Sequence, residues 1–569
     1  MRKITVLAVI IVLLLIVGTL FFTRHRPSAD NNPAAFLPAD TVGYIDERQA
    51  QERGQRFLAS PLGQAITAID LPSLVRGLAA PENLQADLKK SINDVKDFLN
   101  SKLADELLGD RFVVALLPSR DWMKEPGVLP DLRRQLVLLC KPRHGVTAID
   151  LLASVYSGNL TTETVAHGQY SLKRFKNDNI SFVTCAVNGW LVVAFEERAL
   201  GEALDTFDAR TNFFAASKSF EKIVTSLPPE SDQIVYLRLS DLARLTKDFL
   251  ARLPAPKQAA LAGQIDSALA GLDAFAYGSW TQNGVLNERM FVSFIPDKAP
   301  AAVKKILTTP PQKDGMLPHL RDNLVLYSYS GVSNWSAAFD SLEKEQGSKV
   351  ETFAGHSLKE LRQMLGDGPS RLFVRKGDGE RTLPLPLVNF CVTAAEPEKL
   401  GDTAATLLAR TGIKMTKGKF QDASYQVWNE APGKNLRFYS ALWRGQWCLG
   451  NSLDFFKEMA EPPPASASLL ADKDFKVVDD GINQPAQSLF YVQVDQSLDL
   501  LHDACGWLAT ILAVQNKDLS AKAKLINERL IFPILEGAKM YRRSFSRAVV
   551  EGNMLRIDAK TSMAPVESK

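Results

Sequence analysis

The chain has 569 residues, of which 46% are hydrophobic and 23% charged, and its formal net charge is +3. This composition is that of a folded globular protein and excludes a disordered chain. So small a net charge excludes a nucleic-acid partner recognised through bulk electrostatics. The length predicts two domains or more.

The first element is an uncharged apolar run from Ile4 to Phe22. A helix rises about 1.5 Å per residue, so this run reaches nearly across the roughly 30 Å hydrocarbon core of a bilayer. The residues that follow it, beginning Thr23-Arg24, lack the small-residue site at which a signal peptide is cut. The run therefore predicts an uncleaved transmembrane anchor at residues 4–22, which makes the membrane a partner of the chain.

The charges that flank the anchor favour a cytoplasmic N-terminus. Arg2 and Lys3, with the terminal amine, outweigh Arg24 and Arg26 on the other side. Residues 1–3 are then a cytoplasmic tip and residues 23–35 a linker. We therefore predict a single-pass protein of the inner (cytoplasmic) membrane, with the bulk of the chain in the periplasm or outside.

After the anchor the chain repeats itself once, because aromatic and glycine landmarks recur at offsets of 255 or 257 residues. The matched residues are Gly109 and Gly366, Trp190 and Trp447, Phe220 and Phe475, and Tyr236 and Tyr491. Both glycines stand in a Leu-Gly-Asp sequence at the end of a helical stretch, where glycine suits a helix C-terminus. Offsets this steady predict two tandem copies of one unit.

Within each copy, alternating apolar runs are joined by short turns, which predicts strands linked as hairpins. Asn188-Gly189 and Asn283-Gly284 are strong hairpin signals. Strands joined in this way favour a mostly antiparallel sheet with helices on one face. The predicted fold class is α+β: a single N-terminal transmembrane helix followed by two tandem sheet-and-helix units. The copies span residues 36–296 and 317–563, with a linker at 297–316 and a tail at 564–569.

The cysteines show neither metal-ligand spacing nor a regular disulfide framework. They are Cys140, Cys185, Cys391, Cys448 and Cys505. Four of them fall in strand-like runs, where we interpret them as small buried hydrophobes. A Cys140–Cys185 or a Cys391–Cys448 bridge between neighbouring strands stays open for an oxidising compartment.

The stretch from Leu498 to Val514 carries apolar residues at helical spacing, among them Leu501 and Leu508. We interpret this stripe as the core face of a helix, which is the commoner case. The alternative is that this helix and a second one predicted at residues 240–253 line an apolar cavity for an acyl chain. Polar substitutions at Leu501 and Leu508 discriminate: lipid loss without unfolding indicates a cavity, and unfolding indicates core.

The chain carries none of the familiar catalytic motifs: no Gly-x-Ser-x-Gly elbow, no His-Glu-x-x-His and no Gly-x-x-x-x-Gly-Lys-Ser/Thr. His144 lies four residues after Cys140, and His167 precedes a strand, but both sit in turn-like sequences. We interpret them as surface residues. With Asp110 they are the candidates on which an enzyme hypothesis would rest. We predict no catalytic residue, no cofactor and no metal site.

The layout of an anchor, an exported part opening at residues 36–42 and a repeated Leu-Gly-Asp strand entry resembles a bacterial domain-of-unknown-function family of N-terminally membrane-anchored extracytoplasmic proteins. The resemblance implies a location and a fold, and transfers no catalytic residue. The first functional hypothesis is a non-enzymatic binding or scaffold protein of the cell envelope, with envelope proteins or lipid as partners. The second is a lipid-handling protein with an apolar cavity, and the third is an enzyme of unrecognised class.

Overall fold

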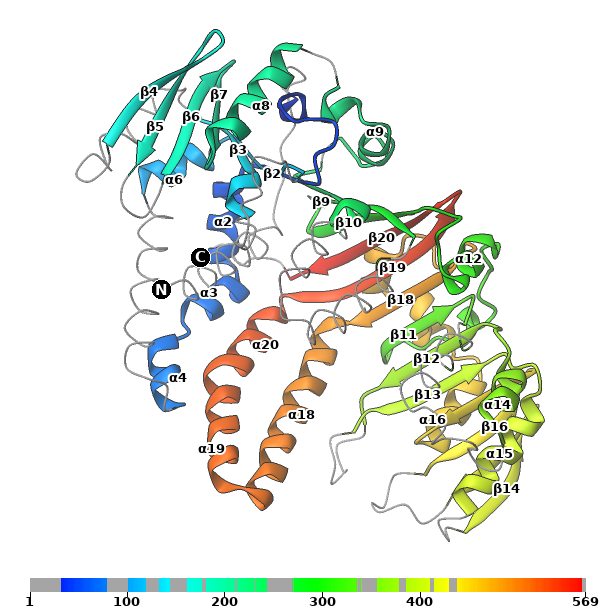
Figure 1. Ribbon diagram of the computed structural model, residues 1–569. Coiled ribbons are helices and arrows are strands. Elements are labelled where there is room, and N and C mark those ends of the chain that lie inside the picture. Colours follow the sequence, from blue (N-terminus) through cyan, green and yellow to red (C-terminus); the bar gives the residue numbers. More distant parts are fainter. Residues whose placement is uncertain are drawn as a thin grey trace. The chain divides into compact units, whose positions relative to one another are not determined.

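The structure is a computed structural model of the chain. It describes residues 32–78, 101–118, 132–143, 161–176, 181–209, 212–229, 231–242, 269, 271–333, 335, 339, 356–377, 385–409, 414–428 and 437–564. The predicted anchor at 4–22, His144 and most of the helix predicted at 240–253 lie outside these ranges. The described residues are α+β, as predicted, and their strands pair antiparallel (Figure 1).

The chain forms two compact units. Unit 1 comprises residues 1–60 and 71–299, and unit 2 comprises residues 61–70 and 300–569. The elements described in unit 1 are η1 (Pro33–Phe36), β1 (Gly43–Arg48), α2 (Ala50–Ala59), α4 (Leu71–Gly77), α6 (Lys102–Leu107), β2 (Arg111–Leu116), η3 (Leu132–Gln135), β3 (Leu136–Lys141), β4 (Thr161–His167), β5 (Tyr170–Lys176), β6 (Ser181–Val187), β7 (Trp190–Ala194), α8 (Glu197–Ala209), η4 (Phe214–Ala216), α9 (Lys218–Val224), β8 (Gln233–Arg238), β9 (Leu272–Gln282) and β10 (Val285–Phe294).

The elements described in unit 2 are α3 (Pro61–Thr67), α12 (Ala301–Thr308), η5 (Leu317–His319), β11 (Leu324–Ser330), α14 (Leu358–Leu365), β12 (Ser370–Arg375), β13 (Leu387–Val392), α15 (Pro397–Ala409), β14 (Met415–Phe420), β15 (Ala423–Trp428), β16 (Tyr439–Trp443), β17 (Gln446–Gly450), α16 (Leu453–Ala460), η7 (Ala465–Ala467), η8 (Leu469–Ala471), α17 (Lys473–Val478), β18 (Ser488–Gln493), α18 (Val494–Gln515), α19 (Lys517–Ile526), η9 (Asn527–Ile531), α20 (Phe532–Ala538), β19 (Tyr541–Glu551) and β20 (Met554–Met563). Helix α12 lies in the stretch predicted as a linker.

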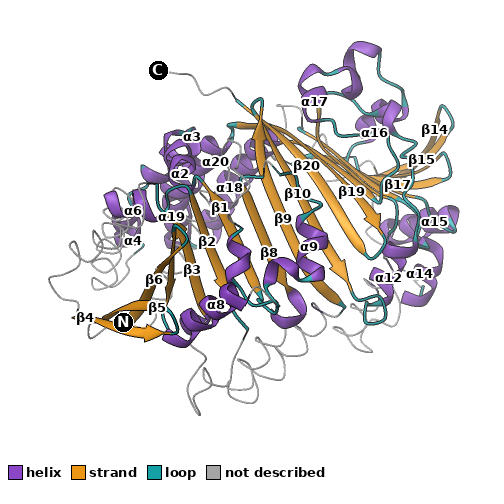
Figure 2. Ribbon diagram, turned by 90° about the horizontal axis from the view of Figure 1, so that it is seen from above, coloured by secondary structure: helices purple, strands orange, loops and turns teal. Residues whose placement is uncertain are grey.

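The strands of each unit pair in one order. In unit 1 the order is β10-β9-β8-β1-β2-β3-β7-β6-β5-β4 (Figure 2). In unit 2 it is β20-β19-β18-β11-β12-β13-β17-β16-β15-β14. The second order repeats the first strand for strand, counted along the chain.

The predicted hairpins are confirmed, and their turns explain why. Asn188 and Gly189 have φ of 49° and 77°, and Asn283 and Gly284 have φ of 52° and 75°. Positive φ at both central residues is the type I′ turn, which matches the twist of the flanking strands and favours Asn-Gly. The first turn joins β6 to β7 and the second joins β9 to β10.

In each sheet a cross-strand pair of buried tyrosines has a phenylalanine packed edge-on against it. The pairs are Tyr44 with Tyr236 in unit 1 and Tyr327 with Tyr491 in unit 2. Phe220 lies 5.3 Å from Tyr236 between ring centroids at 82°, and Phe475 lies 5.3 Å from Tyr491 at 84°. Such edge-to-face pairs add to the free energy of burial. The landmarks found in the sequence therefore form the same core contact in both units.

Of the two disulfides left open, the structure contains Cys391–Cys448, which joins directly opposed residues of β13 and β17. At the corresponding place in unit 1, Cys140 of β3 lies opposite Leu191 of β7. Cys140 and Cys185 stay free and buried, because β7 lies between their strands.

Candidate functional site

Helix α18 of unit 2 is long and apolar, and little of it is buried. Within the part of the chain that the structure describes, Val494–Val514 is long and apolar enough to cross a membrane, and only 6% of its most apolar stretch is buried. A helix that is apolar all round is ordinarily buried in a protein core or in a membrane. The described residues of α18 are instead half-buried or exposed.

Apolar side chains of α18 are exposed at Leu501, Ala504, Trp507, Leu508 and Val514, and Ile511 among them is half-buried; we call these six residues the outer face. The polar residues His502, Asp503 and Thr510 of the same helix are also exposed. Leu501 is 48% exposed, Leu508 54% and Val514 88%. The interpretation of this stripe as a core face is therefore wrong for these residues. The sequence could not reveal this, because core stripes and exposed apolar stripes have the same spacing.

The opposite side of α18 packs against the rest of a helical hairpin (Figure 1). The His502 ring lies 3.9 Å from the Phe532 ring, between centroids. Ser520 Oγ donates a hydrogen bond to the carbonyl of Ala509 at 2.9 Å, and Asn527 Nδ2 donates one to the carbonyl of Cys505 at 2.9 Å. These contacts join α18 to α19, to η9 and to α20, and we call α18 with α19 the helical hairpin.

Asn516 forms the turn between α18 and α19. Its backbone is extended, at φ −156° and ψ 113°, which ends α18. Its side-chain oxygen accepts hydrogen bonds from the amides of Asp518 and Leu519, which caps the start of α19. Val514 and Leu519, both exposed, flank this turn. The polar turn at residues 515–518 is therefore flanked by one exposed apolar side chain on each helix.

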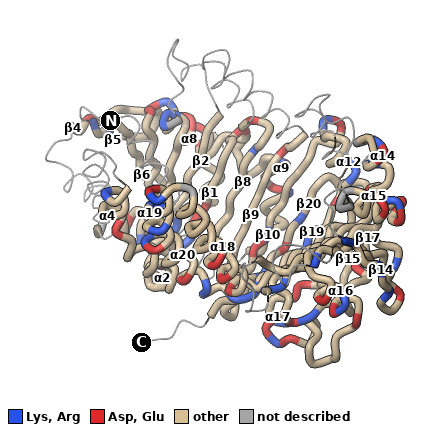
Figure 3. The backbone as a smooth tube through the Cα atoms, turned by 90° about the horizontal axis from the view of Figure 1, so that it is seen from below, with Lys and Arg blue, Asp and Glu red and all other residues tan. Residues whose placement is uncertain are grey.

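Charge is unevenly distributed over the hairpin (Figure 3). Near the sheet, Asp495 pairs with Arg543 at 3.1 Å and Asp499 pairs with Lys539 at 2.8 Å. From residue 504 to residue 516 no residue is charged. The α19–η9 side carries four basic and two acidic residues: Lys517, Lys522, Lys524 and Arg529 with Asp518 and Glu528. The helix is thus fixed by ion pairs at its base and has an uncharged tip with an excess of basic residues beside it.

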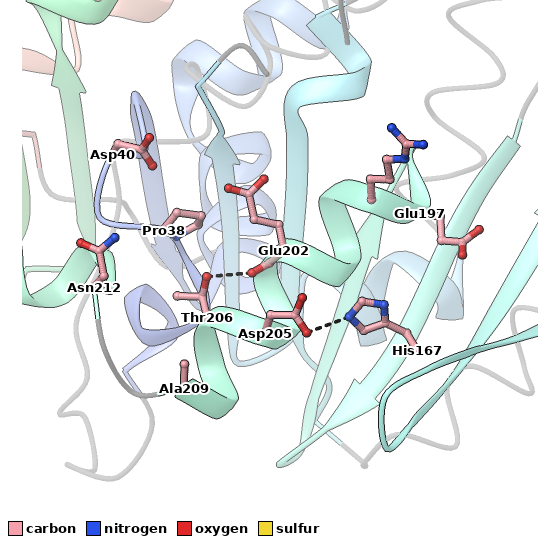
Figure 4. A pocket seen from close by; sticks show the side chains of 10 residues that line it. Pro38, Asp40, His167, Glu197, Glu202, Asp205, Thr206, Ala209 and Asn212 are labelled. Carbon is pink, nitrogen blue, oxygen red and sulfur yellow. Dashed lines mark hydrogen bonds and ion pairs between the residues drawn. The ribbon is translucent and has the colours of Figure 1, made fainter. Parts of the chain in front are cut away.

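A cavity of about 540 Å³, lined mainly by polar side chains, lies beside α8 in unit 1 (Figure 4). It is lined by Asp40, His167, Glu197, Glu202 and Asp205, among others. His167 Nε2 lies 2.8 Å from Asp205 Oδ1. The imidazole also covers Gly201, where an added Cβ would come within 2.7 Å of the ring. The structure therefore brings together His167, an enzyme candidate, and a carboxylate that the sequence did not single out.

The same place in unit 2 indicates a structural role for this contact. There the β14–β15 turn is fastened to α16 by Gln421 Nε2, which donates to Glu461 Oε1 at 3.2 Å, and by Lys457 over the Phe420 ring at 5.6 Å. In unit 1 the β4–β5 turn is fastened to α8 by His167 and by Tyr170, whose hydroxyl donates to Asp208 at 2.6 Å. Each unit clasps this hairpin to a helix with different side chains.

Of the remaining enzyme candidates the structure describes only Asp110. Asp110 is exposed and lies 3.7 Å from Lys141 of β3. His144 lies outside the described residues. Among the described residues, no group of three or more histidine, cysteine, aspartate or glutamate side chains is placed to hold a metal ion.

The buried carboxylates of both sheets belong to core ion pairs. In unit 1, Asp46 accepts hydrogen bonds from Tyr44 at 2.9 Å and from Arg111 Nε at 2.7 Å. Burial opposes ionisation of Asp46, but Arg111 outweighs burial and lowers the pKa of the carboxyl. In unit 2, Asp314 accepts from Arg371 Nε at 2.8 Å and from the Tyr327 hydroxyl. Each unit thus has one buried tyrosine–carboxylate–arginine group.

Glu47, the neighbour of Asp46 in β1, lies on the opposite face of the sheet. Its burial predicts that the stability of unit 1 depends on pH. It is 3% exposed and its Oε2 accepts from Arg53 at 3.0 Å. Burial outweighs Arg53 and raises the pKa of Glu47 from 4.5 to about 8, and burial raises the pKa of nearby Asp232 to about 6. The folded chain therefore holds the Glu47 proton more tightly than the unfolded chain. This contribution to stability is complete below about pH 4.5 and is lost as the pH rises towards about 8.

We expect the urea concentration at the unfolding midpoint of unit 1 to decrease as the pH rises from about 6 to about 8. This window lies above the pKa of Asp232, so the decrease reports on Glu47. Glu47→Gln is expected to remove most of this fall, because the amide cannot lose a proton. Hydrogen exchange of β1 peptides over a series of urea concentrations, at about pH 6 and at about pH 8, measures the urea midpoint of unit 1. Glu52→Gln, at a half-exposed position on α2, is the matched control and keeps the fall. An unaltered slope in Glu47→Gln would contradict this assignment.

Comparison with known proteins shows no family for the chain: no family model and no curated protein matches it. Two solved structures titled "Structure of crystal form III of TP0453" and "Structure of crystal form IV of TP0453" are similar to it at 13% identity. The alignments cover 51% and 50% of this chain and 91% and 88% of those chains, each with a TM-score of 0.25. A likeness at this score carries no argument about function.

Proposed function

We propose that the protein is a membrane-anchored, extracytoplasmic binding or scaffold protein of the cell envelope, and that it is not an enzyme. The observation that carries the proposal is the uncovered outer face of α18. A contiguous exposed apolar surface marks an interaction site, because water makes such a surface costly to leave open. The clasp that holds His167 supports a structural role for the best-placed enzyme candidate.

Two features support the location. The uncharged run from Ile4 to Phe22 has the length of a single transmembrane helix. The Cys391–Cys448 bridge suits an oxidising compartment, such as the periplasm of a bacterium. Alkaline carbonate extraction tests the anchor, because a chain with a transmembrane helix stays in the membrane pellet. Release of the full-length chain would contradict it.

We further propose that the two units are copies of one module, as the tandem repeat in the sequence and the family resemblance imply. The matched strand orders and the matched tyrosine–phenylalanine contacts support this. The alternative of a lipid-handling protein with an apolar cavity has less support, since Leu501 and Leu508 lie on the surface.

Photocrosslinking tests the binding surface. With Leu508→p-benzoylphenylalanine in the full-length chain, illumination in the host membranes is expected to give a covalent adduct, because Leu508 lies at the centre of the outer face. The same residue introduced at Val477 of α17 is the matched control, since Val477 is 52% exposed in the same unit and outside the hairpin. Equal or absent adducts at the two positions would contradict a binding surface on α18.

A further inference from the structure

We propose that the partner of the outer face is a lipid bilayer, and that the tip of the α18–α19 hairpin inserts into the membrane interface. The inference rests on the proposed function, which supplies the nearby membrane, and names the partner. It starts from the mismatch between the composition of α18 and its surroundings: the helix is apolar enough for hydrocarbon, yet only 6% of its most apolar stretch is buried.

The side chains at the tip are those that a bilayer interface accommodates. The stretch from residue 504 to residue 516 has no charge that would require an ion pair from a partner. Trp507 lies on the outer face, and tryptophan is enriched at membrane interfaces because its ring is apolar and its N–H is polar. Val514 and Leu519 are the most prominent apolar side chains beside the turn. These side chains would enter the interface on either side of the polar turn at residues 515–518.

The charges favour a bilayer with anionic headgroups. Lys517, Lys522 and Lys524 follow the tip directly, within one helix. Two of them have acidic neighbours on the same side, Asp518 and Glu528, so the excess of positive charge is modest. Lipid phosphates attract such a basic segment over about a Debye length. Asp495 and Asp499 of α18, by contrast, lie near the sheet, where Arg543 and Lys539 pair with them, whereas Asp503 is exposed and lies 3.7 Å from His502.

The same charges limit how far the hairpin enters. For α18 to cross the hydrocarbon, Lys517 and Asp518 would have to cross with it, and charged side chains are costly at the bilayer centre. An interfacial helix buries its apolar face only about 5–10 Å deep. The geometry therefore points to shallow insertion of the tip and outer face, with the sheet of unit 2 remaining in water.

A fluorophore at the outer face tests the inference. We would label Leu508→Cys with the polarity-sensitive dye NBD in the full-length chain, in a Cys505→Ser background. The chain is reconstituted into vesicles of phosphatidylcholine and phosphatidylglycerol. The expected result is a blue shift of the NBD emission and a severalfold rise in its intensity relative to the free dye conjugate in buffer. Lipids that carry a doxyl group near the headgroup are expected to quench this emission. Val477→Cys with the same label and background is the control and is expected to stay unquenched.

Each outcome decides the inference. Doxyl quenching at position 508 but not at 477, weakened in phosphatidylcholine alone, supports it. A blue shift without quenching means that a protein surface, such as a second copy, covers the face, and overturns it while the proposed binding function stands. A water-exposed dye in a chain that resists carbonate extraction also overturns it. Absence of both quenching here and photocrosslinks at position 508 removes the binding surface altogether.

Discussion

Replacing Arg371 with methionine is expected to destabilise unit 2 by about 3–5 kcal/mol, the cost of leaving a buried charge without its partner. The side chain of Asp314 is fully buried and that of Arg371 is 6% exposed, so water cannot replace the lost contact. The Arg371 guanidinium also lies 5.2 Å from the centre of the Tyr329 ring. Urea unfolding followed by hydrogen exchange in β11 and β12 peptides measures the loss.

Two variants make this prediction specific. Arg542→Met removes an exposed ion pair with Asp495 in the same unit, and such pairs contribute at most about 1 kcal/mol. Arg371→Met combined with Asp314→Leu is expected to recover much of the loss, because no unpaired charge remains. If Arg371→Met unfolds no more easily than Arg542→Met, the buried pair does not stabilise unit 2.

Removing the disulfide is the second large effect. The bridge closes a separation of 57 residues. The loop-closure entropy of the unfolded chain then predicts a loss of about 4 kcal/mol for Cys391→Ala with Cys448→Ala. Urea unfolding of unit 2 in the absence of reductant is the measurement, and Cys505→Ala is the control that keeps the bridge.

Thiol titration in denaturant gives an independent check on the same bridge. Of the five cysteines in the chain, three are free in the structure, so the unreduced protein is expected to react with three equivalents of reagent. Five equivalents from protein isolated out of the envelope would show that the bridge is absent there. The variant should then unfold at the same urea concentration as the wild type.

The hairpins could be predicted because their signals are local. Asn188-Gly189 and Asn283-Gly284 specify a turn type by themselves, and the alternating runs beside them specify the strands. The recurrence of Trp190 and Trp447 could be found because a repeat compares the chain with itself. Trp190 is the first residue of β7 and Trp447 is the second residue of β17, and these two strands have the same place in their sheets.

The exposed helix could not be predicted in the same way. Leu501 and Leu508 have the spacing of a core stripe, and only the structure shows that they are about half exposed, at 48% and 54%. The pairing of Asp314 with Arg371 joins residues 57 positions apart, and no local pattern connects them. The clasp between His167 and Asp205 depends on how the β4–β5 turn meets α8, which is again a tertiary contact.

The short helix α3 belongs to unit 2, although its segment, residues 61–70, precedes most of unit 1 in the sequence. Unit 2 is therefore built from two separate segments, which bears on the order in which it can fold during synthesis. Gly537 of α20 approaches so closely that an added Cβ would lie 2.8 Å from the Leu62 Cα. Leu62 leaves the ribosome 475 residues before Gly537. The contact between the segment at 61–70 and α20 can therefore form only after the C-terminal helices have been synthesised. A chain that starts at Pro300 would lack this segment, and the face of α20 at Gly537 would be left uncovered.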